Sequence, residues 1–109
     1  MADVLGGFEQ AVLLAMIHLG DEAYGRAILK EVERRLGRSV AVGAVHATLE
    51  RLENKGLVTS RLGSGTPVRA GRPRRYYSLA PSGRRALNDA RAAIEALWCG
   101  LQWPLKGRV

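Results

Sequence analysis

The chain has 109 residues, of which 47% are hydrophobic and 25% charged, and this composition excludes both general disorder and a pair of independent cores. No apolar run approaches the roughly 20 residues of a membrane-spanning helix, and the first residues lack the basic segment and cleavage site of a signal peptide. The single cysteine, Cys99, has no partner for an intrachain disulfide. We therefore expect one soluble domain in the cytoplasm, with no membrane partner.

The net charge of +7 is concentrated in one central stretch of the chain. Residues 1–56 hold seven basic and eight acidic residues, and residues 86–109 hold three and two. Residues 57–85 hold seven arginines and no acid. A charge run is ordinarily a solvated surface, but this acid-free stretch in an otherwise balanced chain favours a polyanionic partner.

Two helices are predicted in the first 37 residues. Apolar residues three or four apart predict a helix over 8–19, which Gly20 ends. Asp21 is the expected N-cap of a second helix, which ends at Gly37. The inward face of this second helix is expected to carry Ile28, Val32 and Leu36.

A third helix is predicted over 42–55, with Val45, Leu49 and Leu52 on its buried face. Gly56 follows as the expected C′ residue, because glycine adopts the left-handed conformation without steric cost. The other side chains near the start of this helix are then expected on its outer flanks.

A two-stranded hairpin is predicted next, because the spacing of apolar residues changes to that of strands. Residues 57–62 and 74–79 are rich in β-branched and aromatic residues, and a Gly- and Pro-rich loop separates them. Alternation places Tyr77 and Leu79 on the face toward the helices and Tyr76 on the other face.

A last helix is predicted from Pro81, whose missing N–H costs nothing in a first turn, to a stop at Pro104. Its apolar residues follow coiled-coil spacing. This helix either completes the monomer core or forms a dimer seam, and we favour the seam because the three helices and the hairpin before it leave little apolar surface to cover. The expected interface residues are Leu87, Ala90, Ile94, Leu97, Trp98 and Leu101.

The predicted order of three helices, two strands and a helix is typical of a winged helix-turn-helix, a mainly α fold with a small β-hairpin. We predict a DNA-binding domain over 1–80, a dimerisation helix over 81–103 and a short tail over 104–109. In this fold the third helix enters the major groove, and the basic hairpin reaches the phosphate backbone or minor groove. The expected DNA-binding residues are Gly43, Ala44, His46, Ala47, Thr48 and Arg51 in the helix and Arg69, Arg72, Arg74, Arg75 and Tyr76 in the wing.

Several segments together resemble regulators of the PadR family. Residues 43–58 (GAVHATLERLENKGLV) resemble the recognition-helix signature of that family, and residues 71–79 (GRPRRYYSL) resemble its wing. The pair Tyr24-Gly25 and the start of the last helix, Gly83 with Ala86-Leu87, also fit. The likeness runs from about Leu5 to Leu101, in matching order and spacing.

This resemblance implies a homodimeric repressor of the short PadR type, in which the C-terminal helix dimerises. Family members usually carry tyrosine where this chain has His46, a position expected to touch DNA, so the operator sequence stays open. They usually carry threonine at the position of Ala80, which here lacks a capping hydroxyl. Trp98 is a candidate contact for a flat aromatic effector, and the plainer alternative is a tryptophan that anchors the interface.

No motif predicts catalysis. The two histidines and the cysteine have neither metal-ligand nor triad spacing, and the Gly63–Thr66 loop lacks the Gly-Lys-Ser/Thr ending of a phosphate-binding loop. We expect no enzyme activity, metal or cofactor. Two other functions stay open: a basic RNA-binding accessory protein, which a dimer with paired recognition helices would disfavour, and a protein-interaction adaptor, which would tolerate loss of the wing arginines.

Overall fold

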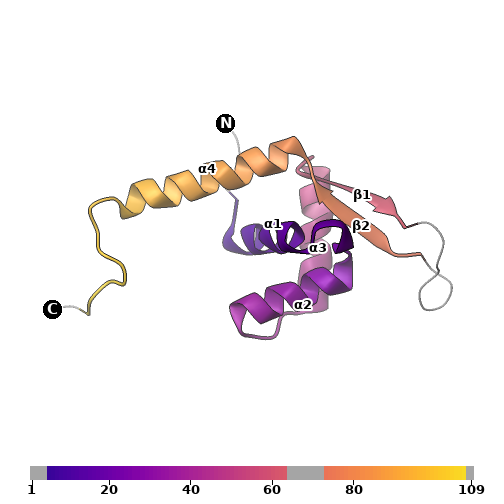
Figure 1. Cartoon of the computed structure of the whole chain (residues 1–109), viewed down its shortest axis with the longest axis horizontal. Helices are drawn as coiled ribbons and strands as arrows, with labels where there is room; N and C mark the ends of the chain where they lie inside the picture. Colours follow the sequence, from indigo (N-terminus) through magenta and orange to yellow (C-terminus); the bar gives the residue numbers. More distant parts are fainter. Residues whose placement is uncertain (1–4, 64–72, 108–109) are drawn as a thin grey trace.

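The predicted architecture is confirmed by the computed structural model, which describes residues 5–63 and 73–107. These residues form three helices, a hairpin and a last helix, in the predicted order (Figure 1). The elements are α1 (Gly7–Leu19), a short 3-10 turn η1 (Gly20–Glu22), α2 (Gly25–Leu36), α3 (Val42–Asn54), β1 (Val58–Leu62), β2 (Arg75–Leu79) and α4 (Pro81–Trp98). Among the described helices, none combines the length and apolar character needed to cross a lipid bilayer.

The core lies where α1, α2 and α3 meet, beneath the first half of α4. Its fully buried side chains are Val12, Leu13, Ile28, Val32, Val45, Leu49, Leu52 and Val58. The predicted inward residues of α3 are therefore confirmed. The inward position expected for Leu36 on α2 is wrong: this side chain is 45% exposed, because it is the last residue of the helix and the chain turns away at Gly37.

The turn between α2 and α3 is closed by Gly37 and by a side chain of α2. Gly37 has a φ of 70°, and its amide donates to the Glu33 carbonyl at 2.8 Å. The Glu33 carboxylate accepts a hydrogen bond from the Val40 amide at 3.0 Å. Glu33 thus satisfies backbone groups on both sides of the turn and sets the direction in which α3 leaves.

The end of α3 confirms the expected role of Gly56. This residue has a φ of 76°, and its amide donates to Glu53 O at 2.9 Å. The Leu57 amide donates to Leu52 O at 3.0 Å, which completes a Schellman motif. The chain is thereby turned directly from α3 into β1.

The hairpin is antiparallel, with Val58 opposite Leu79 and Leu62 opposite Arg75. Both strands lie within one residue of their predicted bounds. Tyr77 and Leu79 pack against the helical core, as alternation predicted. In Figure 1 the hairpin projects from one end of the helical body, and α4 extends past the other end.

The start of α2 differs from the prediction. Asp21 lies in η1 and is not the N-cap, which is Tyr24. The segment before α2 is held extended by β2, because Tyr77 N donates to Ala23 O at 2.8 Å and Tyr24 forms an isolated bridge with Tyr76. A strand-like contact that is distant in sequence therefore delays the helix by one turn.

Helix α4 begins as predicted and ends early. Ala80 is its N-cap without a side-chain hydrogen bond, and Pro81 is its first residue. The helix stops at Trp98 and not at Pro104, because Gly100 adopts a φ of 87° and turns the chain out of the helix. The predicted dimerisation helix over 81–103 is thus five residues shorter than expected.

Candidate nucleic-acid interface

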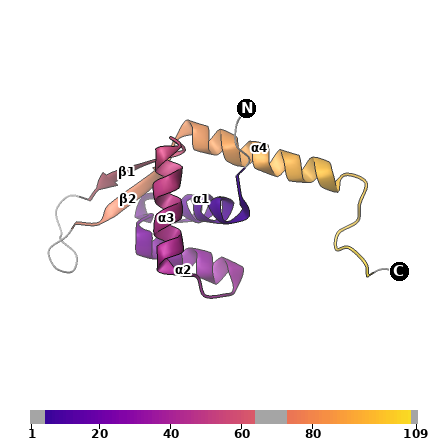
Figure 2. The ribbon, with the colours of Figure 1, turned by 180° about the vertical axis from the view of Figure 1, so that it is seen from behind.

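The first two turns of α3 form an exposed face with small side chains. Gly43, Ala44, His46 and Ala47 are all exposed, while the buried Val45 holds the helix against the body. Figure 2 shows α3 in front of the other helices, with the hairpin beside it. Because three of these four residues carry at most a methyl group, a nucleic-acid backbone or base edge could approach the helix closely.

Thr48 does not belong to this face, which corrects one of the expected DNA-binding residues. Its side chain is 2% exposed, and its hydroxyl accepts a hydrogen bond from Arg51 Nη2 at 3.3 Å. The cause is helical geometry: Thr48 lies three residues after Val45 and next to Leu49, on the inward side.

Arg51 is half exposed, but its guanidinium forms an ion pair with a carboxylate of α1. Its Nε donates to Glu9 Oε2 at 3.2 Å, and Lys55 Nζ donates to the same oxygen at 3.1 Å. Burial alone would raise the pKa of Glu9, but the Gly6 amide, Lys55 and Arg51 outweigh it and hold the pKa below its ordinary 4.5. Glu9 therefore ties the second half of α3 to α1, a role that nothing in the sequence pattern indicated.

His46 lies against the start of α2. Its Cε1 atom is 3.4 Å from the point that a Cβ on Gly25 would occupy, which is an ordinary contact distance. The exposed face of α3 is in this way placed directly beside the N-terminal end of α2. The Tyr24-Gly25 pair singled out in the sequence thus lies next to the expected recognition surface.

The base of the wing is a cluster of two arginines and two tyrosines, which we call the cation–aromatic cluster (Tyr24, Arg61, Arg74 and Tyr76). The guanidinium of Arg74 lies 4.1 Å from the ring centroid of Tyr24, and that of Arg61 lies 4.9 Å from the ring of Tyr76. The two rings meet edge to face with centroids 5.7 Å apart. Two of the expected wing residues, Arg74 and Tyr76, are brought together here, and Tyr24 and Arg61 join them unpredicted.

Arg75 is exposed at the start of β2, on the same strand face as Tyr77, and it reaches toward the end of α3. Its Nη1 donates to Ser60 Oγ at 3.0 Å, and Ser60 in turn donates to Glu53 at 2.8 Å. Arg75 is thereby part of a polar chain on the protein surface. The expected DNA contacts Arg69 and Arg72 lie outside the described residues.

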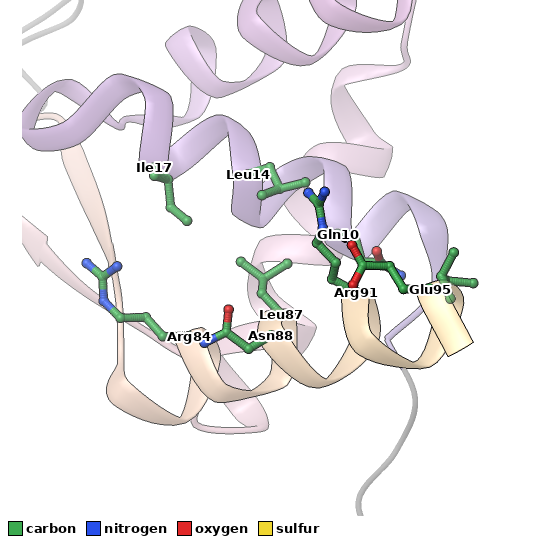
Figure 3. A pocket seen from close by; sticks show the side chains of 9 residues that line it. Gln10, Leu14, Ile17, Arg84, Leu87, Asn88, Arg91 and Glu95 are labelled. Atoms are coloured by element: carbon green, nitrogen blue, oxygen red, sulfur yellow. Dashed lines mark hydrogen bonds and ion pairs between the residues drawn. The ribbon is translucent and has the colours of Figure 1, made fainter. Parts of the chain in front are cut away.

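Helices α1 and α4 border an open groove of about 590 Å³. Figure 3 shows Leu14 and Ile17 of α1 and Leu87 of α4 at this groove, with Arg84 and Asn88 along its rim. Leu14 and Ile17 are 46% and 45% exposed. An apolar strip of α1 is thus open to solvent beside α4.

Two expected interface residues belong to the monomer. Leu87 and Ala90 are 9% and 6% exposed and join the core, because the first half of α4 packs on α1. Ile94 and Leu97 are 49% and 74% exposed, and Trp98 is half-buried. Leu101 is 59% exposed and lies beyond the end of the helix. The exposed apolar surface therefore begins at Ile94, about two turns later than the heptad pattern indicated.

A three-helix body, a recognition helix with an exposed small-residue face and a basic hairpin define a winged-helix DNA-binding regulator. Residues 13–89 match the transcriptional regulator PadR-like family. The chain belongs to this family, and it is a DNA-binding transcriptional regulator.

Individual relatives agree with this assignment. Transcriptional regulator Rv3488 of Mycobacterium tuberculosis is 38% identical over 89 residues, which cover 80% of this chain and 78% of that protein. A PadR-like transcription factor from Bacteroides fragilis superposes with a TM-score of 0.66 at 27% identity, covering 83% of this chain and 82% of that one. RosR of H. salinarum superposes with a TM-score of 0.69 at 25% identity, covering 94% and 84%.

Proposed function

We propose that this regulator is a homodimeric repressor that binds a palindromic operator through α3 and the wing of each protomer. The observation that carries the dimer is the uncovered apolar surface of α4. Ile94 and Leu97 face solvent in the single chain, and Ile94 lines the groove that also contains Leu14 and Ile17 of α1. Burying one such side chain is worth about 1.5–3 kcal/mol, so a second copy that covers this surface would gain substantially.

A dimer of this kind suits an operator with two-fold symmetry. An isologous seam along α4 relates the two copies of α3 by a two-fold axis, which is the symmetry of a palindromic site. Two recognition helices that enter successive major grooves read half-sites about 34 Å apart. In this arrangement the exposed residues at the start of α3 read base edges, and the arginines of the wing contact flanking phosphates.

The dimer is tested by the mass in solution of two matched variants. Leu97→Glu introduces a charge into the proposed seam, and we expect it to convert the dimer to a monomer and to abolish tight operator binding. Leu62→Glu is the control, since Leu62 is an equally apolar side chain, 54% exposed, at the far end of β1. The proposal fails if Leu97→Glu keeps the wild-type mass, or if both variants lose it.

We propose further that a flat aromatic effector releases the operator by binding beside Trp98. Trp98 is half-buried at the end of α4, at the edge of the proposed seam, while Trp103 is 80% exposed. A bound ligand there would change the angle between the two winged domains. The test is quenching of tryptophan fluorescence by planar cationic and phenolic compounds: Trp98→Phe should remove the response and Trp103→Phe should keep it. Unchanged tryptophan fluorescence of the wild type with every compound would contradict the proposal of an aromatic effector.

A further inference from the structure

The cation–aromatic cluster joins two parts of the fold that are separate in sequence. Tyr24 is the residue before α2, whereas Tyr76 and Arg74 lie in or next to β2 and Arg61 lies in β1. Arg61 and Tyr76 are direct cross-strand partners. The two tyrosine rings form the centre of the cluster, and one guanidinium lies over each ring: Arg74 over Tyr24 and Arg61 over Tyr76.

The backbone around the cluster holds both rings in place. Tyr24 and Tyr76 form an isolated bridge, next to the hydrogen bond from Tyr77 N to Ala23 O. On its other side the Tyr76 ring lies against the bare Cα of Gly63: a Cβ there would be only 2.7 Å from Tyr76 Cε1. Tyr76 is therefore confined between Gly63 and Tyr24, and Tyr24 connects this face of the wing to the start of α2.

We propose that Tyr24 is a positioning residue for DNA binding: it fixes the wing relative to α3 and directs Arg61 and Arg74 toward the DNA backbone. The connection to α3 is short, because Gly25 follows Tyr24 and the His46 imidazole lies close by, 3.4 Å from the point that a Cβ on Gly25 would occupy. A displacement of Tyr24 would thus change the distance between the wing cations and the exposed face of α3.

The charges of the cluster indicate an anionic ligand. Within residues 5–63 and 73–107, neither Arg61 nor Arg74 forms an ion pair with a carboxylate. Interaction with Tyr76 raises the pKa of Arg74, and an arginine side chain stays protonated at any physiological pH. A guanidinium group that lies over a tyrosine ring still has N–H groups on its outer edge. These N–H groups can donate hydrogen bonds to the phosphate oxygens of a duplex.

The test compares Tyr24→Leu with Tyr24→Phe in binding to a fluorescent duplex, measured as a function of salt. Phenylalanine keeps the ring and its contacts with Tyr76 and Arg74, so we expect affinity within about twofold of the wild type. Leucine removes the ring, and we expect affinity to fall about five- to thirtyfold. The slope of log K against log salt should become shallower by about one for each phosphate that the wing no longer reaches.

A double-mutant cycle separates positioning from a merely structural role. Arg74→Gln alone should weaken binding, and Tyr24→Leu should then cost less affinity than it does in the wild type, because one of the two arginines that Tyr24 positions is already gone. The melting temperature of each variant is recorded, so that affinity is compared between folded proteins. Independent, additive losses, or wild-type affinity and slope in folded Tyr24→Leu, overturn the inference. A loss in Tyr24→Phe equal to that in Tyr24→Leu also overturns it, in favour of a direct hydroxyl contact.

The inference rests on the proposed function in one respect, because it takes DNA as the ligand. The choice of duplex distinguishes a failure of the Tyr24 inference from a failure of the proposed dimeric binding to a palindrome. The cycle is run on a mixed-sequence duplex at low salt as well as on any selected operator. Coupling between Tyr24 and Arg74 on the mixed duplex upholds the inference even if no palindrome is selected and the protein is monomeric. Absence of any duplex binding by the wild type at low salt overturns both.

Discussion

Among the described glycines, Gly83 is the one at which an added Cβ would come nearest to another atom, and replacing it with alanine should destabilise the protein. A Cβ at Gly83 would lie 2.2 Å from the Leu57 carbonyl oxygen and 3.3 Å from its carbon. Ordinary contact begins at about 3.4 Å, so the start of α4 would have to move away by about 1 Å. That oxygen also accepts the Ala80 amide at 2.9 Å, and Ser82 Oγ donates to Gly56 O at 2.7 Å. The two hydrogen bonds that attach α4 to the α3–β1 turn are therefore strained by the same movement.

The magnitude follows from three contributions. Overpacking against backbone costs about 1–3 kcal/mol, and loss of one hydrogen bond adds about 1 kcal/mol. Alanine returns up to about 1 kcal/mol through its higher helix propensity. We expect Gly83→Ala to lower the free energy of unfolding by about 1–3 kcal/mol, which lowers the melting temperature by roughly 5–15 °C for a chain of this size.

The assay is thermal unfolding followed by circular dichroism, at one fixed protein concentration because a dimer melts in a concentration-dependent way. Gly7→Ala is the matched control. Gly7 is also in the first turn of a helix, and a Cβ added there would have no atom within 4 Å. This variant should melt at or above the wild-type temperature. A Gly83→Ala protein that melts no lower than Gly7→Ala would refute the steric argument.

Two further predictions concern Glu9 and Thr48. Because the native pKa of Glu9 is below 4.5, its ion pairs stabilise the fold fully above about pH 5, and this contribution is lost as the pH falls from 4.5 through the lower native value. Glu9→Gln should therefore reduce stability at pH 7 by about 1–3 kcal/mol and flatten the acid side of a urea-unfolding pH series; an unchanged pH dependence would show that Arg51 and Lys55 contribute nothing through Glu9. Thr48→Val should bind operator DNA within about twofold of the wild type, since the hydroxyl is buried; a tenfold loss, or about 1.4 kcal/mol, in a fluorescence titration would restore Thr48 to the interface.

Most of the fold could be predicted from the sequence because the signals that specify it are local. Helical spacing placed the core residues of α3, Gly56 marked the end of α3, and alternation assigned Tyr77 and Leu79 to the inner face. The errors arose where a distant contact overrides local preference. Asp21 is a good capping residue, yet hydrogen bonding between Ala23 and β2 delays the start of α2.

The candidate site was predicted less completely, because side-chain partners come from elsewhere in the chain. Arg51 is of a residue type that often contacts DNA, and only the fold brings it to Glu9, 42 residues away in the sequence. Tyr24 belongs to a family motif, but its ring contacts with Arg74 and Tyr76 depend on the bridge between η1–α2 and β2. Heptad spacing does not reveal how much of α4 the monomer itself covers.

Recognition of a two-fold symmetric operator by a dimer can be tested by selecting binding sites from a random duplex library and measuring the mass of the protein–DNA complex on the selected site. We expect a palindromic consensus with half-sites about one helical turn apart, bound by twice the 11.8 kDa chain mass. A single unsymmetrical half-site bound by one chain, or a stable dimer that enriches no sequence, would contradict this mode of binding.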